Sequence, residues 1–334
     1  MSASLNKKIK LLYLLEILKE YSDEQHPLTS FEIIDKLSSY GISVERKAIY
    51  SDIEVLITAG YDIIKTKTPK SGYFLADREF EKPELSLLAD AVMASNFITS
   101  KKTREILKKL EKFMSVYDAI KFRNRIFINN KNKCDNEEIY YIIDKLQSAI
   151  DENKKVEFLY FKHHFDGKTP NLSEKTFKIS PYALVWEDDN YYLIGNNEKY
   201  NNLMHLRVDR IKKVNILKEK SRNFEEVSTY KGFFDTADYT TKAFNMFGGE
   251  RATIELLCKN NSFEQIIDRL GKNVTIRKYD NEHFLVLSDS IVSEGLSKWI
   301  LQFSGDIEVL SPPKLRNMVE DRVERLCNIY KKEH

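Results

Sequence analysis

The chain has few of the features that mark secreted, membrane-bound or redox proteins. Among 334 residues there are only three cysteines, 11 glycines and seven prolines. Cys134, Cys258 and Cys327 are too far apart for a metal pair or a redox motif, and their odd number argues against a disulfide framework. There is no run of about eighteen apolar residues and no basic-then-apolar signal peptide at the N-terminus. These absences predict a soluble, cytoplasmic protein with no membrane partner.

The sequence also lacks the motifs of common enzymes. It has no Walker-type glycine loop, no dinucleotide fingerprint and no nucleophile elbow. The spacing of His163, His164 and His205 matches no known metal-ligand pattern. In addition, the two adjacent histidines would point to opposite faces of a strand, so they could not bind the same metal ion. Asp188 and Asp189 are typical of a solvated hairpin turn. We therefore expect neither catalysis, nor a metal, nor a cofactor.

Length and composition indicate several domains. A chain of 334 residues with 42% hydrophobic content can form two or three separate cores. The patterns below predict an α+β multidomain protein with boundaries at 1–80, 81–134, 135–225 and 226–334. The formal net charge is only +2, so the chain as a whole has no strong field that would attract nucleic acid.

Residues 43–60 are predicted to form a helix with one apolar stripe and one polar face. Ser43 can cap its first amides and Gly60 can end it in a left-handed conformation. The apolar stripe consists of Ile49, Ile53 and Leu56. The polar face consists of Arg46, Lys47, Tyr50, Ser51 and Glu54. Asp52 lies off this face, which favours an ion pair or a cap as its role.

The neighbouring segments indicate a helix-turn-helix. Residues 7–21 form a helical pattern, and Thr29 to Glu32 is a capping box that opens a second helix ending at Gly41. The connection 41–43 then leads directly into the helix at 43–60. In a helix-turn-helix this last helix enters the major groove of DNA.

A hairpin follows, with strands in 61–75 around a turn at 69–72, and would form a wing. The predicted DNA-binding residues are Arg46, Lys47, Tyr50, Ser51, Lys65, Lys67 and Lys70. Basic and acidic side chains nearly cancel over residues 1–80, so a small helical domain with an ordinary charged surface is the alternative interpretation.

The next segment, 83–133, reads as a helical linker that is unusually basic. Between Lys101 and Lys133, eleven lysines and arginines face only three acids, Glu105, Glu111 and Asp118. A solvated helix face explains this composition, and a surface that follows DNA phosphates is the alternative.

Beyond Cys134 the pattern changes to a helix at 136–153 followed by short strands. The strands are expected at 156–161, 176–180, 183–186, 191–195, 205–208 and 211–217. A helix followed by five or six short strands suggests a small, strongly bent, barrel-like sheet.

Three segments of this region, 179–186, 191–195 and 205–211, resemble the WYL domain. The family's Trp-Tyr-Leu triplet reads Tyr191-Tyr192-Leu193 here, so an aromatic ring remains at the first position but the indole N–H is lost. The resemblance implies an Sm-like β-barrel or sandwich that follows a winged helix-turn-helix in bacterial regulators and senses nucleic acid or another anionic ligand.

Arginine guanidinium groups that lie next to aromatic rings on one strand can also bind a phosphate or a nucleobase. The candidate ligand residues are Tyr160, Tyr191, Tyr192, His205, Arg207 and Arg210. Core packing is the alternative for Tyr192 and Leu193, and an ion pair that holds an arginine is the alternative for Asp209.

The last hundred residues show the order βαββαβ and then a closing helix, which predicts a ferredoxin-like αβ domain. The expected elements are strands at 253–258, 274–279, 284–288 and 307–310 and helices at 263–270, 292–303 and 313–330. This part resembles the C-terminal extension that often follows a WYL domain, which implies dimer contacts and a cover for the ligand site.

Two functions are consistent with these patterns. The first is a homodimeric transcription factor that binds a double-stranded DNA operator and responds to a nucleotide or nucleic-acid fragment in its WYL domain. The alternative is a nucleic-acid-binding accessory protein of a repair or phage-defence system whose WYL domain binds single strands.

Overall fold

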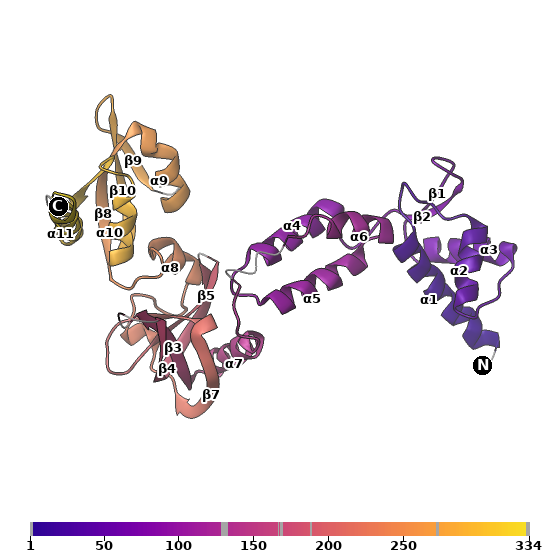
Figure 1. Cartoon of the computed structure of the whole chain (residues 1–334), viewed down its shortest axis with the longest axis horizontal. Coiled ribbons are helices and arrows are strands. Elements are labelled where there is room, and N and C mark those ends of the chain that lie inside the picture. The colour runs from indigo at the N-terminus through magenta and orange to yellow at the C-terminus, as the bar shows by residue number, and fades with distance from the viewer. Residues whose placement is uncertain are drawn as a thin grey trace. The chain divides into compact units, whose positions relative to one another are not determined.

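The computed structural model describes residues 3–127, 133–165, 167, 170–187, 189–271 and 274–331. Asp188 of the expected acidic turn, the side chain of His163 and residues 128–132 of the basic segment lie outside the described part. The chain divides into two compact units, Met1–Asp135 and Asn136–His334 (Figure 1). Each unit is described by itself.

The first unit begins with three helices and a hairpin. The elements are α1 (Ala3–Tyr21), α2 (Ser30–Ser39), α3 (Arg46–Thr58), β1 (Ile63–Thr66) and β2 (Gly72–Leu75). β1 and β2 are antiparallel, with Ile63 opposite Leu75. The predicted stripe Ile49, Ile53 and Leu56 is buried against α1 and α2, which confirms the orientation of α3.

The start of α3 differs from the expectation. Ser43 is exposed and caps nothing; the N-cap is Glu45, and its side chain makes no capping bond. Ile42 and Val44 pack against the core, and the helix begins only after these residues. The connection between the helices therefore runs from residue 40 to residue 45 and is longer than the three residues expected.

Other local expectations are confirmed. Thr29 and Glu32 form the capping box of α2. Gly60 has φ +99°, the left-handed conformation that closes α3. Asp52 forms an ion pair with Lys10 of α1, at 2.5 Å between Nζ and Oδ2. This pair explains why Asp52 is not on the exposed face of α3.

The rest of the first unit is helical, as predicted. It contains α4 (Lys82–Ala94), α5 (Ser100–Leu110), the short helix η1 (Glu111–Phe113) and α6 (Val116–Arg123). Their core includes Leu85, Leu107 and Phe122. Ser115 joins this part to the preceding one, because its hydroxyl donates to Asp23 Oδ2 at 2.6 Å.

The second unit begins with α7 (Ile139–Asp151) and a five-stranded antiparallel sheet. The strands are β3 (Lys154–Phe165), β4 (Pro170–Glu187), β5 (Asn190–Asn196), β6 (Met204–Arg207) and β7 (Ile211–Lys220), in the order β6-β5-β4-β3-β7. The expected strands at 176–180 and 183–186 are one strand, β4, with an irregularity between Pro181 and Ala183. This break in register allows β4 to take part in both halves of the sheet.

The chain then forms α8 (Thr236–Lys242) and a second sheet. Its elements are β8 (Glu250–Lys259), α9 (Phe263–Leu270), β9 (Thr275–Lys278), β10 (His283–Val292), α10 (Glu294–Leu301), β11 (Ile307–Ser311) and α11 (Pro313–Tyr330). The strand order is β11-β8-β10-β9, all antiparallel. The short helices η3 (Val208–Arg210), η4 (Phe224–Glu226) and η5 (Asn260–Ser262) complete the unit.

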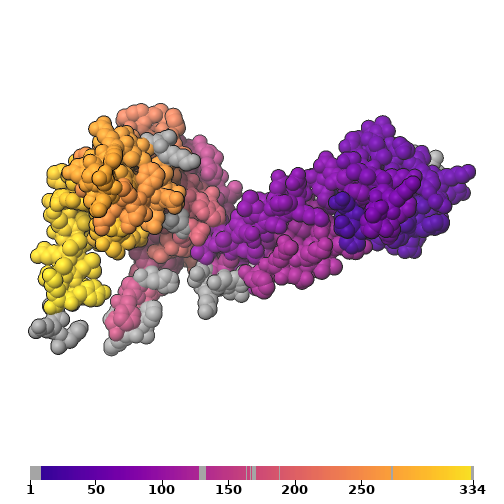
Figure 2. Space-filling model, turned by 90° about the horizontal axis from the view of Figure 1, so that it is seen from above, coloured from indigo at the N-terminus to yellow at the C-terminus, as the bar shows by residue number. Residues whose placement is uncertain are grey.

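α8 connects the two sheets of the second unit. Tyr239 and Ala243 lie in a buried cluster with Ala183 and Ile194 of the first sheet and Ile291 of the second. Figure 2 shows the same unit from above, with the orange surface of the second sheet region in front of the pink to salmon surface of the first sheet. Of the helices in the described ranges, none has the length and apolar character that crossing a bilayer requires.

Candidate nucleic-acid interface and ligand site

The exposed face of α3 carries the residues predicted to contact DNA. Arg46, Lys47, Ser51 and Glu54 are exposed and Tyr50 is half-buried, on the side opposite Ile49 and Ile53. Because α3 packs against the core by its apolar face, its exposed face is free to enter a groove of DNA.

Arg46 is the most precisely positioned residue of this face. Its Nε donates to the Tyr50 hydroxyl oxygen at 2.7 Å, and its guanidinium carbon lies 5.2 Å from the centre of the Phe31 ring. Ser30 and Arg46 act as hydrogen-bond donors to the phenol oxygen and lower the pKa of Tyr50. The sequence pattern did not single out Phe31, although 66% exposure of so large an apolar side chain distinguishes it in the structure.

The three hairpin lysines have different surroundings. Lys65 lies 5.7 Å from the ring of Tyr73, and Lys67 is exposed and has no acidic partner among the described residues. Lys70 forms an ion pair with Glu32 of the α2 capping box, at 2.5 Å. Lys70 therefore fastens the hairpin to α2, whereas Lys67 is available for a phosphate.

The basic stretch also has a defined surface. Lys101, Arg104 and Lys108 of α5 line a hollow of about 450 Å³ and form no ion pair with any described residue. Nearby, Glu105 pairs with Lys102, and Glu111 pairs with Arg123. The basic stretch therefore carries both paired cations and cations without an acidic partner among the described residues.

Four of the six predicted ligand residues lie close together in the first sheet and the short helix η3 that follows β6. The Tyr160 hydroxyl accepts from the Arg207 backbone N–H at 3.3 Å, and Arg210 also approaches that hydroxyl. Tyr192 stands opposite Arg207 across β5 and β6, so their side chains share a face. Burial raises the pKa of Tyr160.

Arg207 is held by Asp209, as the alternative for Asp209 predicted. Its Nε and Nη2 donate to the two carboxylate oxygens at 3.0 and 2.8 Å, and this bond raises the pKa of Arg207. The structure does not bring Tyr191 to this group. Strand alternation puts Tyr191 on the face opposite Tyr192, where its ring meets Trp186 edge-on at 5.7 Å.

His205 shares the face of Arg207 but is covered. Its Nε2 is 2.7 Å from the hydroxyl oxygen of Tyr239 on α8, and the two rings are stacked. Burial lowers the pKa of His205 to about 4, so the ring is neutral at pH 7. Sequence reasoning missed this contact because Tyr239 lies in a seven-residue helix with no distinctive pattern.

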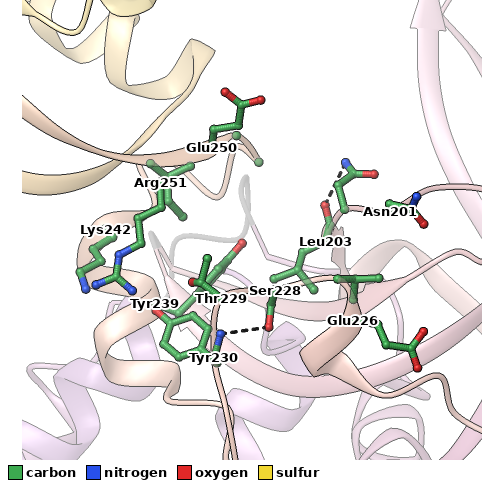
Figure 3. Close-up of a pocket in the computed structure, with 15 residues that line it drawn as sticks. Asn201, Leu203, Glu226, Ser228, Thr229, Tyr230, Tyr239, Lys242, Glu250 and Arg251 are labelled. Carbon is green, nitrogen blue, oxygen red and sulfur yellow. Dashed lines mark hydrogen bonds between the residues drawn. The ribbon is translucent and has the colours of Figure 1, made fainter.

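A cavity of about 680 Å³ lies beside this contact (Figure 3). Lys242 and Arg251 are on one side of it, and Asn201 and Leu203 are on the opposite side. Tyr239 forms part of the wall, so the residue that covers His205 also faces the cavity. Its volume is in the range of pockets that hold small molecules.

Charges in the cavity wall neutralise one another. Lys242 pairs with Asp238 at 2.7 Å and with Asp289 at 3.2 Å. Arg251 Nε donates to the same Asp289 at 2.7 Å, and the Tyr230 hydroxyl donates to Asp238 at 2.6 Å. This network connects α8 to strands β8 and β10. Because each cation has an acidic partner, the network favours structural coupling over attraction of an anion.

Comparison with known proteins assigns a domain to each of the two sheets of the second unit. A WYL domain model matches residues 141–216 and a WCX domain model matches residues 250–327. The uncharacterized HTH-type transcriptional regulator YobV of Bacillus subtilis (strain 168) is 22% identical over 305 residues, which cover 86% of this chain and 90% of that protein. The chain therefore contains a WYL domain followed by a WCX domain, and it is similar over most of its length to an HTH-type transcriptional regulator. The resemblance noted in residues 179–211 is thereby confirmed.

Two solved structures are similar to this WYL-domain protein only in a general way. Proteasome accessory factor B/C (PafBC) of Arthrobacter aurescens is 15% identical with a TM-score of 0.28, covering 97% of this chain and 49% of that one. The chain thus spans about half the length of PafBC. A CRISPR Cas-related protein is 14% identical with a TM-score of 0.37, covering 99% and 87% of the two chains. Neither likeness carries an argument about function.

Proposed function

We propose that this protein is a cytoplasmic, DNA-binding transcriptional regulator and not an enzyme. The observation that carries the proposal is the exposed face of α3, where Arg46, Lys47 and Tyr50 project from a helix whose other side is buried. The WYL domain match and the similarity to an HTH-type transcriptional regulator support the same assignment. In this proposal the first three helices and the β1–β2 hairpin form a winged helix-turn-helix, with α3 in the major groove of an operator.

The second unit is the regulatory part in this proposal. Its first sheet is an Sm-like domain, and its second sheet, with the order β11-β8-β10-β9, is ferredoxin-like and mediates a homodimer. An anionic ligand, either a nucleotide or a nucleic-acid fragment, binds at Arg207 and Arg210 beside Tyr160 and Tyr192.

The His205–Tyr239 bond supports a route from the ligand to the dimer. A ligand at Arg207 would shift β6, and β6 is joined to α8 through His205. α8 in turn contacts β10 and α9 of the second sheet. A few kcal/mol of differential binding would be enough to change the spacing of two DNA-binding units.

The test is a selection of bound fragments from genomic DNA with the purified full-length protein at stated salt. We expect enrichment of a duplex with two related half-sites, and loss of its protection when Arg46→Ala is used. Arg277→Ala serves as the matched control, because Arg277 is exposed on β9 in the other unit. Absence of any enriched duplex would contradict the proposal. Binding of single strands alone, abolished by Arg207→Ala, would instead support the accessory-protein function.

A further inference from the structure

The position and contacts of Arg46 suit it to contact a DNA base. It is the first residue of α3, and the first residues of a recognition helix lie nearest the base edges. Its Nε is already engaged by the Tyr50 hydroxyl. What remains is the pair of terminal nitrogens, Nη1 and Nη2, which take no part in this bond.

These two nitrogens have no hydrogen-bond acceptor among the described residues. Within the described residues Arg46 forms no ion pair, although Glu45 and Glu54 lie on or beside the same helix. A guanidinium with both terminal N–H groups available is a planar fork, and such a fork matches the O6 and N7 acceptors of guanine in the major groove. Adenine offers N7 beside an amino donor, so it cannot accept from both prongs.

Two aromatic rings restrict the guanidinium before any DNA arrives. The Arg46 guanidinium carbon is 5.2 Å from the centre of the Phe31 ring and 5.6 Å from that of Tyr50. An arginine side chain loses rotamer entropy on binding, and part of that loss is already incurred here. This accounts for Phe31, which is 66% exposed on the first turn of α2.

We propose that Arg46 reads a guanine in each operator half-site through Nη1 and Nη2, with Tyr50 and Phe31 as positioning residues. The inference rests on the proposed function, since it names the base that the DNA-binding helix recognises. It also separates Arg46 from Lys67, which is a point charge on the hairpin and carries no base preference.

The experiment uses the full chain and an enriched duplex in which each guanine is replaced, one at a time, by 7-deazaguanine. This base lacks the N7 acceptor and keeps its Watson–Crick pairing. For the wild type, one position per half-site should weaken binding about 10-fold, the loss typical of one hydrogen bond from a charged donor. The Arg46→Ala protein should bind the unmodified duplex about 10-fold more weakly and show no further loss at that position.

The positioning role has its own readout. Phe31→Ala and Tyr50→Phe should both reduce the penalty for 7-deazaguanine at that position, because a loosely held fork discriminates less. Leu12→Ala is the control for the first, since Leu12 is also 66% exposed, on α1. Tyr61→Phe is the control for the second, because it removes a hydroxyl from an exposed tyrosine of the same unit. Both controls should retain the full penalty.

Other outcomes would overturn the inference. If no guanine position couples to Arg46, this residue does not read guanine. If Arg46→Ala weakens binding equally for all sequences and lowers the salt dependence by about one counterion, Arg46 contacts a phosphate instead. Both results leave the proposed regulator in place, because a specific duplex is still bound. Failure of the wild type to bind any duplex would overturn both.

Discussion

His205 of β6 and Tyr239 of α8 are 34 residues apart in sequence, yet the imidazole Nε2 and the phenol oxygen are separated by 2.7 Å. Their rings stack with centroids 5.6 Å apart. This pair joins the strand that ends in Arg207 to the helix that packs on the second sheet. In the proposed regulator it is a contact through which a change at Arg207 would reach the C-terminal part of the second unit.

The buried imidazole predicts a pH-dependent stability of the second unit. Unfolded His205 takes up a proton near its ordinary pKa of 6.5, while the folded protein resists protonation until about pH 4. Falling pH thus favours the unfolded state across this window. The free energy of unfolding should fall by up to about 3 kcal/mol between pH 6.5 and 4, with no further loss from this residue below pH 4.

Tryptophan fluorescence measures this effect selectively, because both tryptophans of the chain, Trp186 and Trp299, lie in the second unit. Urea unfolding curves at several pH values should show a shallower pH dependence for His205→Gln than for the wild type. His283→Gln, in the same unit but on β10, retains His205 and should keep the wild-type loss. Equal slopes for His205→Gln and wild type would show that the ring is not held neutral.

The two adjacent glycines of the cavity wall should respond differently to the same substitution. A Cβ on Gly249 would lie 2.0 Å from the Val292 carbonyl oxygen, whereas a Cβ on Gly248 would meet nothing closer than 3.5 Å. We expect Gly249→Ala to destabilise the second unit by about 1–3 kcal/mol and Gly248→Ala to have little effect. Tryptophan-monitored unfolding tests this. Equal stability of the two variants would mean that β8 and β10 can separate locally without cost.

The hairpin lysines should contribute unequally to DNA binding. Lys67→Ala should lower the slope of log affinity against log salt by about 0.9, the value for one lost phosphate contact. Lys70→Ala should change this slope less, because Lys70 is paired with Glu32. Anisotropy titrations of a labelled operator at four salt concentrations measure both slopes. A full unit of change for Lys70→Ala would show that Lys70 leaves Glu32 when DNA binds.

Arg207 should determine anion binding by the second unit. Arg207→Gln keeps much of the side-chain volume but removes the charge, so we expect at least a 10-fold loss of affinity for a phosphorylated dinucleotide used as a probe. Arg222→Gln is the matched control, since Arg222 also pairs with a carboxylate, that of Glu226, elsewhere in the same unit. Calorimetric titration gives both affinities. An unchanged affinity in Arg207→Gln would place the anion site elsewhere.

Local patterns in the sequence predicted much of the fold. Periodicity located α9 and α11 at their observed bounds, and the capping box of α2 was legible because its two partners are three residues apart. The stripe Ile49, Ile53 and Leu56 gave the orientation of α3 for the same reason. Predictions were weaker where the local structure depends on packing against residues that are distant in the sequence. Ser43 does not cap α3, because Ile42 and Val44 on either side of it pack against a core built largely by α1 and α2.

The candidate site shows the same difference between what local patterns predict and what contacts between distant residues decide. From the sequence alone came the exposed face of α3 and a predicted ligand group of six residues, because residue type and strand or helix period identify them. The structure brings four of the six together, Tyr160, Tyr192, Arg207 and Arg210. Only the tertiary structure paired Arg46 with Phe31, fastened Lys70 to Glu32 and covered His205 with Tyr239. The physical reason is that periodicity determines which face of an element a side chain occupies, whereas its partner depends on how separate elements pack against each other.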